Sequence, residues 1–157
     1  MAKFSGTNGS SGQAITTSYK TLLQVYASSG TQALRRGKVY DILVGTNGTP
    51  ADNYMQWDVS RCTASSTAAT VGALNPLDTA DASAAALLGI NCTGEPTITS
   101  SSNVFNVGVN QRASYRWVAA PGGELVYPAT AQNGLAVRAL SGGYTGTATA
   151  TVNIEEQ

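Results

Sequence analysis

Strict alternation of apolar and polar residues near the C-terminus is the feature that most limits how this chain can fold. In GTATATVNIEEQ (146–157), Ala148, Ala150, Val152 and Ile154 alternate with threonines and an asparagine. Successive side chains of a β-strand point to opposite faces, so a period of two predicts a strand with one buried and one solvated face. Such a strand needs a second layer to cover its apolar face, which indicates a β-sandwich or a barrel.

Other segments share this strand-like character and are separated by turn residues. They include KTLLQVYAS (20–28), KVYDILV (38–44), YMQWDVSRC (54–62), TITSSSNVFNVGVNQ (97–111) and GLAVRAL (134–140). About eight strands with a turn signal every 8 to 12 residues predict an all-β, jelly-roll-like sandwich or barrel.

The segment NQRASYRWVAAPGGELVYP (110–128) combines alternation with a strong turn signal. Tyr115 and Trp117 are predicted on one face of a strand, and Arg112 and Arg116 on the other. The Pro-Gly-Gly sequence that follows favours reversal of the chain. We therefore expect a hairpin, with core aromatic residues on one side and a solvated arginine face on the other.

Two segments do not have the pattern of a strand. LDTADASAAALLG (77–89) is rich in alanine, and Asp78 suits an N-cap while Gly89 suits a C-terminal stop, so it predicts one short helix in a connection. Residues 1–14 are rich in Gly, Ser, Thr and Asn and predict a flexible N-terminal arm with no core of its own. The length of residues 15–157 fits a single domain.

Composition argues against several classes of function. The 157 residues include no histidine, which removes the commonest general base near neutral pH and the commonest metal ligand. Nine basic and nine acidic residues cancel, so the chain lacks the field that attracts nucleic acid or an anionic membrane. No signal peptide, membrane span, phosphate-binding loop or clustered metal ligands can be recognised. We expect no enzyme activity, no cofactor, and no nucleic-acid or membrane partner.

Charged residues inside the predicted strands have a structural and a catalytic interpretation. Asp41 and Asp58 are placed to form cross-strand ion pairs with Arg61, Arg116 or Arg138. In the catalytic interpretation the two aspartates are a glycosidase carboxylate pair, which needs a separation of roughly 5 to 10 Å across a cleft. The ion pairs are favoured because the sequence shows no aromatic-rich groove.

Cys62 and Cys92 are the two cysteines of the chain. A disulfide between them would stabilise the fold by roughly 3 to 4 kcal/mol. A chain that is made and used without export folds where thiols stay reduced, which favours free thiols. The sequence leaves both states open.

Three segments resemble small proteins encoded among the head genes of tailed bacteriophages: LRRGKVYDILVGTNGTPADN, NPLDTADASA and NQRASYRWVAAPGGELVYPATAQNGLAVRA. The likeness covers about residues 34–154. It implies a noncatalytic virion structural protein, a capsid cement or decoration protein that is made in the host cytoplasm and binds the major capsid protein at the capsid surface. Several such proteins are jelly rolls that assemble as trimers, so the resemblance also implies a homotrimer.

Candidate contacts with a capsid or a neighbouring copy follow from exposure and charge. An arm that cannot fold alone gains order against a neighbour, and low charge permits close packing of many copies. The candidates are Phe4 in the arm, Arg35 and Arg36 in the RRGK turn, and Arg112 and Arg116 on the strand face. The alternative function is a phage tail or fibre module, or an adhesin-like domain that binds a glycan through exposed Tyr, Asn and Thr.

Overall fold

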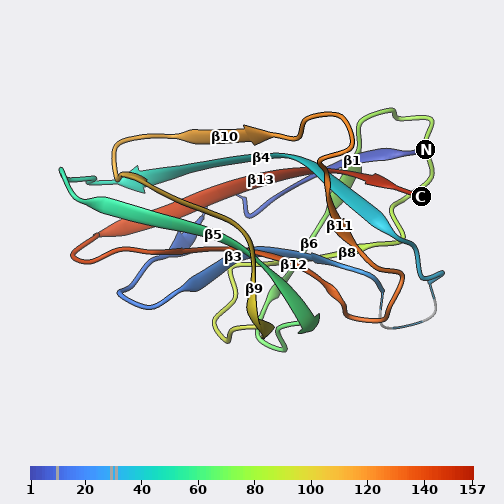
Figure 1. Ribbon diagram of the computed structural model, residues 1–157, viewed down its shortest axis with the longest axis horizontal. Coiled ribbons are helices and arrows are strands. Elements are labelled where there is room, and N and C mark those ends of the chain that lie inside the picture. Colours follow the sequence, from blue (N-terminus) through green and yellow to red (C-terminus); the bar gives the residue numbers. More distant parts are fainter. Residues whose placement is uncertain (10, 29, 31) are drawn as a thin grey trace.

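The computed structural model describes residues 1–9, 11–28, 30 and 32–157, which form two antiparallel β-sheets packed face to face (Figure 1). The first sheet contains β1 (Lys3–Thr7), β2 (Gln13–Ala14), β4 (Gly37–Gly48), β7 (Leu74–Pro76), β10 (Tyr115–Val118), β11 (Leu125–Tyr127) and β13 (Gly146–Glu156). The second contains β3 (Lys20–Tyr26), β5 (Tyr54–Ala64), β6 (Thr70–Gly72), β8 (Leu87–Ile90), β9 (Thr97–Asn110) and β12 (Gly134–Leu140).

The strand order confirms the all-β sandwich. The first sheet runs β10-β4-β13-β1-β7, with β11 also beside β4 and β2 also beside β13. The second runs β6-β8-β3-β12-β5-β9. Both sheets end in open edges, so the molecule is a sandwich and the barrel alternative is wrong. The described residues form thirteen strands instead of about eight, because several connections contain strands of only two to four residues.

The core lies between the two sheets and is built by the alternation that the sequence shows. From the first sheet, Ala148, Ala150, Val152 and Ile154 of β13 are all buried, as predicted. From the second sheet, β5 contributes Met55, Trp57 and Val59, which are almost inaccessible to solvent. Burial of such large side chains supplies most of the stability of a sandwich.

The helix predicted for residues 77–89 is wrong, because no helix occurs in the part of the chain that the structure describes. Asp78 does cap a turn: its carboxylate accepts from Ala80 N at 2.9 Å, and its carbonyl accepts from Asp81 N at 3.0 Å. The turn does not continue, since the backbone N–H of Ala86 instead donates to the carboxylate of Glu156 at 2.6 Å. Residues 87–90 then pair with β3 and β6, so tertiary contacts override the helix propensity of the alanines.

The N-terminal segment is part of the first sheet, in contrast to the flexible arm expected for residues 1–14. β1 pairs with β13 over five residues, and Phe4, opposite Ile154, is 1% exposed. Asn8 follows the strand and is fully buried. Its side-chain amide makes two hydrogen bonds to the backbone of β13: it donates to Ala148 O and accepts from Ala150 N. Phe4 and Asn8 therefore attach residues 3–8 to β13.

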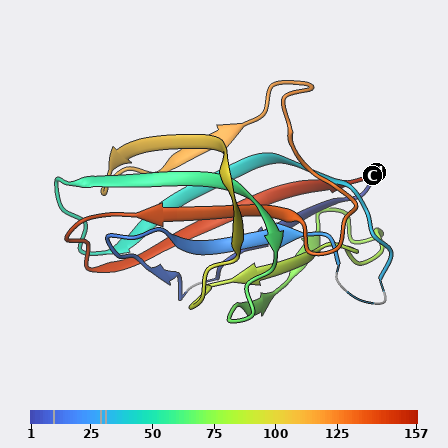
Figure 2. The ribbon, with the colours of Figure 1, turned by 60° about the horizontal axis from the view of Figure 1, so that its bottom comes forward.

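The hairpin expected within residues 110–128 is also wrong. β10 and β11 do not pair with each other; both lie antiparallel to β4, β10 along residues 41–44 and β11 along residues 37–39. The Pro-Gly-Gly sequence therefore forms a loop between two strands on the same sheet edge, and in Figure 2 this loop projects beyond the sheet. The predicted facing of the β10 side chains is confirmed, because Tyr115 and Trp117 point inward and pack against Phe105 of β9.

Candidate functional site

The outer face of the first sheet is broad and carries mostly short polar side chains; we call it the hydroxyl face. It consists of Ser5, Thr7, Asp41, Leu43, Arg116, Thr149, Thr151 and Asn153, from four neighbouring strands. A row of charged side chains, Lys3, Glu155 and Lys38, continues the same outer face at one end. The centre of the hydroxyl face is a row in which Thr151 of β13 lies between Leu43 of β4 and Thr7 of β1. All three side chains are at least partly exposed, whereas the residues that alternate with them are buried in the core. The alternation therefore gives the first sheet one buried face and one face that is in contact with solvent.

One ion pair lies on the hydroxyl face. Arg116 of β10 donates to both carboxylate oxygens of Asp41, at 3.0 and 2.7 Å, and Asn153 of β13 donates a third hydrogen bond at 3.0 Å. The hydrogen bond from Arg116 lowers the pKa of Asp41, more strongly than burial raises it. The arginine side chain is 63% exposed and the Asp41 side chain is 8% exposed, so water reaches the pair from the arginine side. We expect such a pair to contribute less to stability than one that is fully buried.

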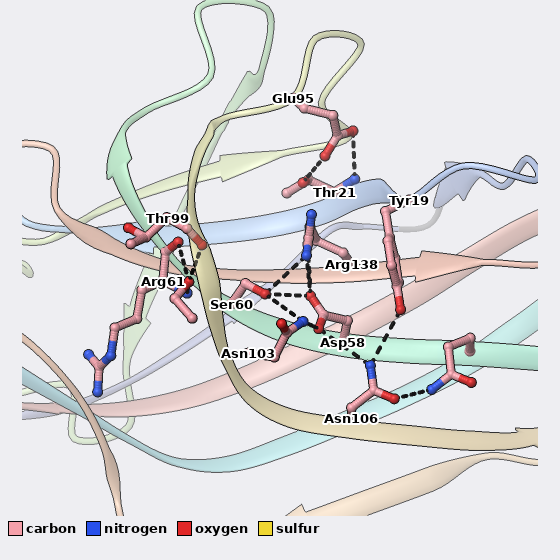
Figure 3. A network of polar contacts seen from close by, with 12 residues as sticks. Tyr19, Thr21, Asp58, Ser60, Arg61, Glu95, Thr99, Asn103, Asn106 and Arg138 are labelled. Atoms are coloured by element: carbon pink, nitrogen blue, oxygen red, sulfur yellow. Dashed lines mark hydrogen bonds and ion pairs between the residues drawn. The ribbon is translucent and has the colours of Figure 1, made fainter.

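The second sheet carries a buried polar cluster on its own outer face, around Asp58 of β5 (Figure 3). Arg138 of β12 donates to the Oδ2 atom of Asp58 from Nε at 2.8 Å and from Nη2 at 2.6 Å, and Ser60 Oγ donates to the same oxygen at 2.7 Å. Asn103 and Asn106 of β9 donate to Oδ1, Asn106 at 3.5 Å. Every lone-pair direction of the carboxylate is therefore engaged.

An aromatic ring covers the charged end of this cluster. Tyr19 lies over the guanidinium of Arg138, 4.6 Å from the ring centroid, and its hydroxyl accepts from Asn106 at 3.3 Å. The Asp58 side chain is inaccessible and the Arg138 side chain is 12% exposed. Charges withdrawn from water to this extent need hydrogen-bond partners to be tolerated, and both carboxylate oxygens of Asp58 have them. The cluster ties together β5, β9, β12 and the segment before β3.

The cross-strand ion pairs predicted from the sequence are confirmed for Asp41 with Arg116 and for Asp58 with Arg138. The two aspartates lie on opposite outer faces of the sandwich, with two sheets roughly 10 Å apart between them, so they do not flank a common cleft. Both carboxylates are also occupied by arginines. The arrangement does not provide the free acid and base that a glycosidase needs.

The remaining predicted contact residues are not brought together. Phe4 is buried in the core, so it is not available as a surface contact. Arg35 and Arg36 are exposed in the segment before β4, at the end of the molecule where the C-terminus bonds Arg36 O. Arg112 lies beyond the opposite end of β4, where it pairs with Asp52 at 3.1 Å. Among the five predicted residues, only Arg116 lies on the hydroxyl face.

Sequence reasoning missed the partners that complete the Asp58 cluster. Tyr19, Ser60, Asn103 and Asn106 come from three separate parts of the chain, and serine or asparagine in a strand carries no motif. The one usable signal is the presence of charged residues inside strands, which identified Asp58 and Arg138. Their neighbours are decided by strand register alone.

A shallow hollow of about 590 Å³ lies beside the end of β9. It is lined by Asp52, Asn53, Tyr54, Gly108, Val109 and Asn110. Tyr54 is half exposed within it, and Gly108 leaves its floor without a side chain. The hollow adjoins the open edge of the second sheet.

Cys62 and Cys92 are both free and buried in the structure. Burial raises the pKa of each thiol from 9.0 to about 11. Only the thiolate is a good nucleophile, so neither residue has the character of a reactive cysteine.

We predict that both thiols are unreactive in the folded protein. At pH 8 roughly one thiol in a thousand is ionised when its pKa is about 11, so iodoacetamide should leave the native chain unlabelled and label two sites once guanidinium unfolds it. Because the folded pKa values are raised, the folded state binds more protons between about pH 9 and 11, and stability should fall as pH rises through that window. Rapid labelling of native protein would contradict this.

The described residues contain no group of three or more His, Cys, Asp or Glu side chains that could hold a metal ion. Over the same part of the chain, no helix is long and apolar enough to cross a membrane. Comparison with known proteins finds no matching family model, no similar curated protein and no similar solved structure.

Proposed function

We propose that the protein is a noncatalytic structural protein of a phage virion, which binds the outer surface of the head and stabilises its lattice as a cement or decoration protein. The partner in this proposal is the major capsid protein. The observation that carries it is the hydroxyl face, where four hydrogen-bonded strands share one outer face and Ser5, Thr7, Thr149 and Thr151 lie side by side.

The chemistry of the hydroxyl face fits a contact with an extended protein surface. Short hydroxyl and amide side chains lose little conformational entropy on contact and can exchange hydrogen bonds with backbone groups of a partner. Leu43, 46% exposed, provides an apolar centre, and the Asp41–Arg116 pair provides a polar rim. The choice of the major capsid protein as partner and of the capsid surface as location rests on the resemblance of residues 34–154 to phage head proteins.

Binding to capsids that lack the protein tests the proposal. Wild-type protein should bind them with a saturable, symmetric stoichiometry and should raise the temperature at which the heads lose their DNA. Thr151→Lys, which places a charge at the centre of the hydroxyl face, should weaken binding at least tenfold. The matched control, Thr70→Lys in the exposed strand β6 of the second sheet, should bind as wild type does.

Failure of wild-type protein to bind heads would overturn the proposal. Recovery of the protein on tails, together with binding to a glycan array, would favour the tail, fibre or adhesin-like alternative. Equal binding by the two lysine variants would show that the hydroxyl face is not the contact.

A further inference from the structure

The open edge of β9 has the properties of a strand that pairs with another chain. β9 is the last strand of the second sheet, and no strand of the described chain pairs with its outer side. Figure 2 shows it beside β5, at the rim of the sandwich. Exposed edges are usually guarded by lysine, proline, an inward charge or a β-bulge. The fourteen residues of β9, TITSSSNVFNVGVN, include no lysine, proline or charged residue. The register irregularities of β9 lie before Phe105, and residues 105–110 are regular.

The hydrogen-bond pattern identifies which backbone groups of β9 face outward. Gln111 N donates to Asn53 O at 2.8 Å, so the pair of residues 111 and 53 is a hydrogen-bonded one. Hydrogen-bonded and non-hydrogen-bonded pairs alternate along an antiparallel ladder, and β9 stays in regular register with β5 from Phe105 to Asn110. The N–H and C=O groups of Asn106 and Gly108 therefore point away from β5. Both residues are exposed.

The side chains next to these groups are apolar and incompletely covered. Phe105, Val107 and Val109 point toward the core but are only partly buried, and Tyr115 and Trp117 of β10 complete the same apolar strip. When an extended segment of another chain adds to the edge of a sheet as a new strand, it covers partly buried aliphatic and aromatic side chains of this kind.

We propose that two copies of this chain pair through β9, antiparallel to each other and related by a twofold axis at Val107. In this register Asn106 lies opposite Gly108 of the second copy, so that the two outward-facing residues of each chain exchange four backbone hydrogen bonds. Val107 then lies opposite its own counterpart, and Phe105 lies opposite Val109. The two six-stranded sheets become one continuous sheet.

The charge of the segment is compatible with pairing to an identical segment. No charged residue lies in β9, so pairing with an identical segment brings no like charges together.

This inference does not depend on the proposed capsid function, because it concerns only the purified chain. It also predicts a different assembly from the homotrimer that the resemblance implies, since pairing of identical edges is twofold and closed. The mass of the protein in solution distinguishes the two.

The first test is the mass of wild-type protein and of two Gly108 variants by light scattering and analytical ultracentrifugation at about 10 to 100 μM, the range in which weak protein pairs form. The chain has a mass of 16.1 kDa, and we expect wild type to have twice that mass. Gly108→Pro removes an outward N–H without removing a hydrogen bond to β5, and it should be monomeric. Gly108→Ala keeps the N–H and is the matched control, so it should remain a dimer.

A second test remains informative if the proline variant does not fold. Val107→Cys places two thiols opposite each other at the twofold axis, in a non-hydrogen-bonded pair where Cβ atoms come closest. Mild oxidation should give a covalent dimer of the folded protein, since the two native cysteines are buried. Val71→Cys, at the exposed opposite edge of the same sheet, should give no covalent dimer under the same treatment, although it still pairs through β9.

A monomer or a trimer of wild-type protein would overturn the inference. So would equal masses for Gly108→Pro and Gly108→Ala, or equal crosslinking of the two cysteine variants. Amide exchange gives an independent readout: the N–H groups of Asn106 and Gly108 should exchange more slowly in wild type as its concentration rises, whereas exchange that does not depend on concentration counts against pairing.

Discussion

Replacing Arg138 by methionine is expected to lower the free energy of unfolding by about 3 to 5 kcal/mol, because the substitution leaves the carboxylate of Asp58 buried without its counter-charge. The Asp58 side chain has no access to water, and Arg138 supplies two of its hydrogen bonds. Methionine keeps most of the length and apolar volume of the arginine stem, so the loss reports the charge and not a cavity. Urea unfolding followed by tryptophan fluorescence measures it.

Arg116→Met is the matched control for this prediction. Arg116 also holds an aspartate through two hydrogen bonds, but its own side chain is 63% exposed, and Asp41 keeps a hydrogen bond from Asn153 and can be reached by water once the arginine is removed. Its substitution should change stability much less than that of Arg138. If the two variants lost equal free energy of unfolding, burial of the Asp58 cluster would not be what determines its contribution to stability.

Replacing Phe4 by alanine is expected to cost about 3 to 5 kcal/mol, the range for truncation of a fully buried aromatic side chain. Phe4 is 1% exposed and its strand pairs on both sides, with β13 and with β7. The denaturant midpoint should fall while the dependence on denaturant concentration stays unchanged.

Lys3→Ala provides the control at the neighbouring position, since Lys3 is exposed on the outer face of the same strand. It should alter stability by less than about 0.5 kcal/mol, as surface substitutions generally do. If residues 1–14 behaved as a loose arm, the two variants would be equally mild, so a small effect of Phe4→Ala would contradict the placement of β1 in the core.

The fold class was accessible from the sequence because it depends on a local pattern. Alternation in residues 146–157 and 54–59 reports which side chains face the core, and the structure places Val152 and Trp57 there. The charge pairs were accessible for a related reason: Asp58 and Arg138 stand inside strands, where an isolated charge needs a partner. Composition likewise indicated the weakly charged surface on which the proposed capsid contact depends.

Tertiary structure alone decided which strands are neighbours, and this is where the predictions failed. The alanines of residues 77–89 favour a helix locally, but Glu156 binds the backbone of Ala85 and Ala86, and β3 pairs with the residues that follow. The Pro-Gly-Gly turn permits a hairpin, but β10 and β11 both bond to β4.

The sequence by itself determined that this chain is built mainly of β-strands and has a hydroxyl-rich surface, because the period of two that marks a strand can be recognised from adjacent residues. The choice of an open sandwich over a barrel came from the tertiary structure. Only the tertiary structure decided that residues 3–7 form a strand, that Tyr19 and Asn103 enclose an ion pair, and that β9 is left as an open edge. These features depend on register between segments far apart in the chain. Register is chosen by the collective burial of many side chains and backbone groups, which no local pattern specifies.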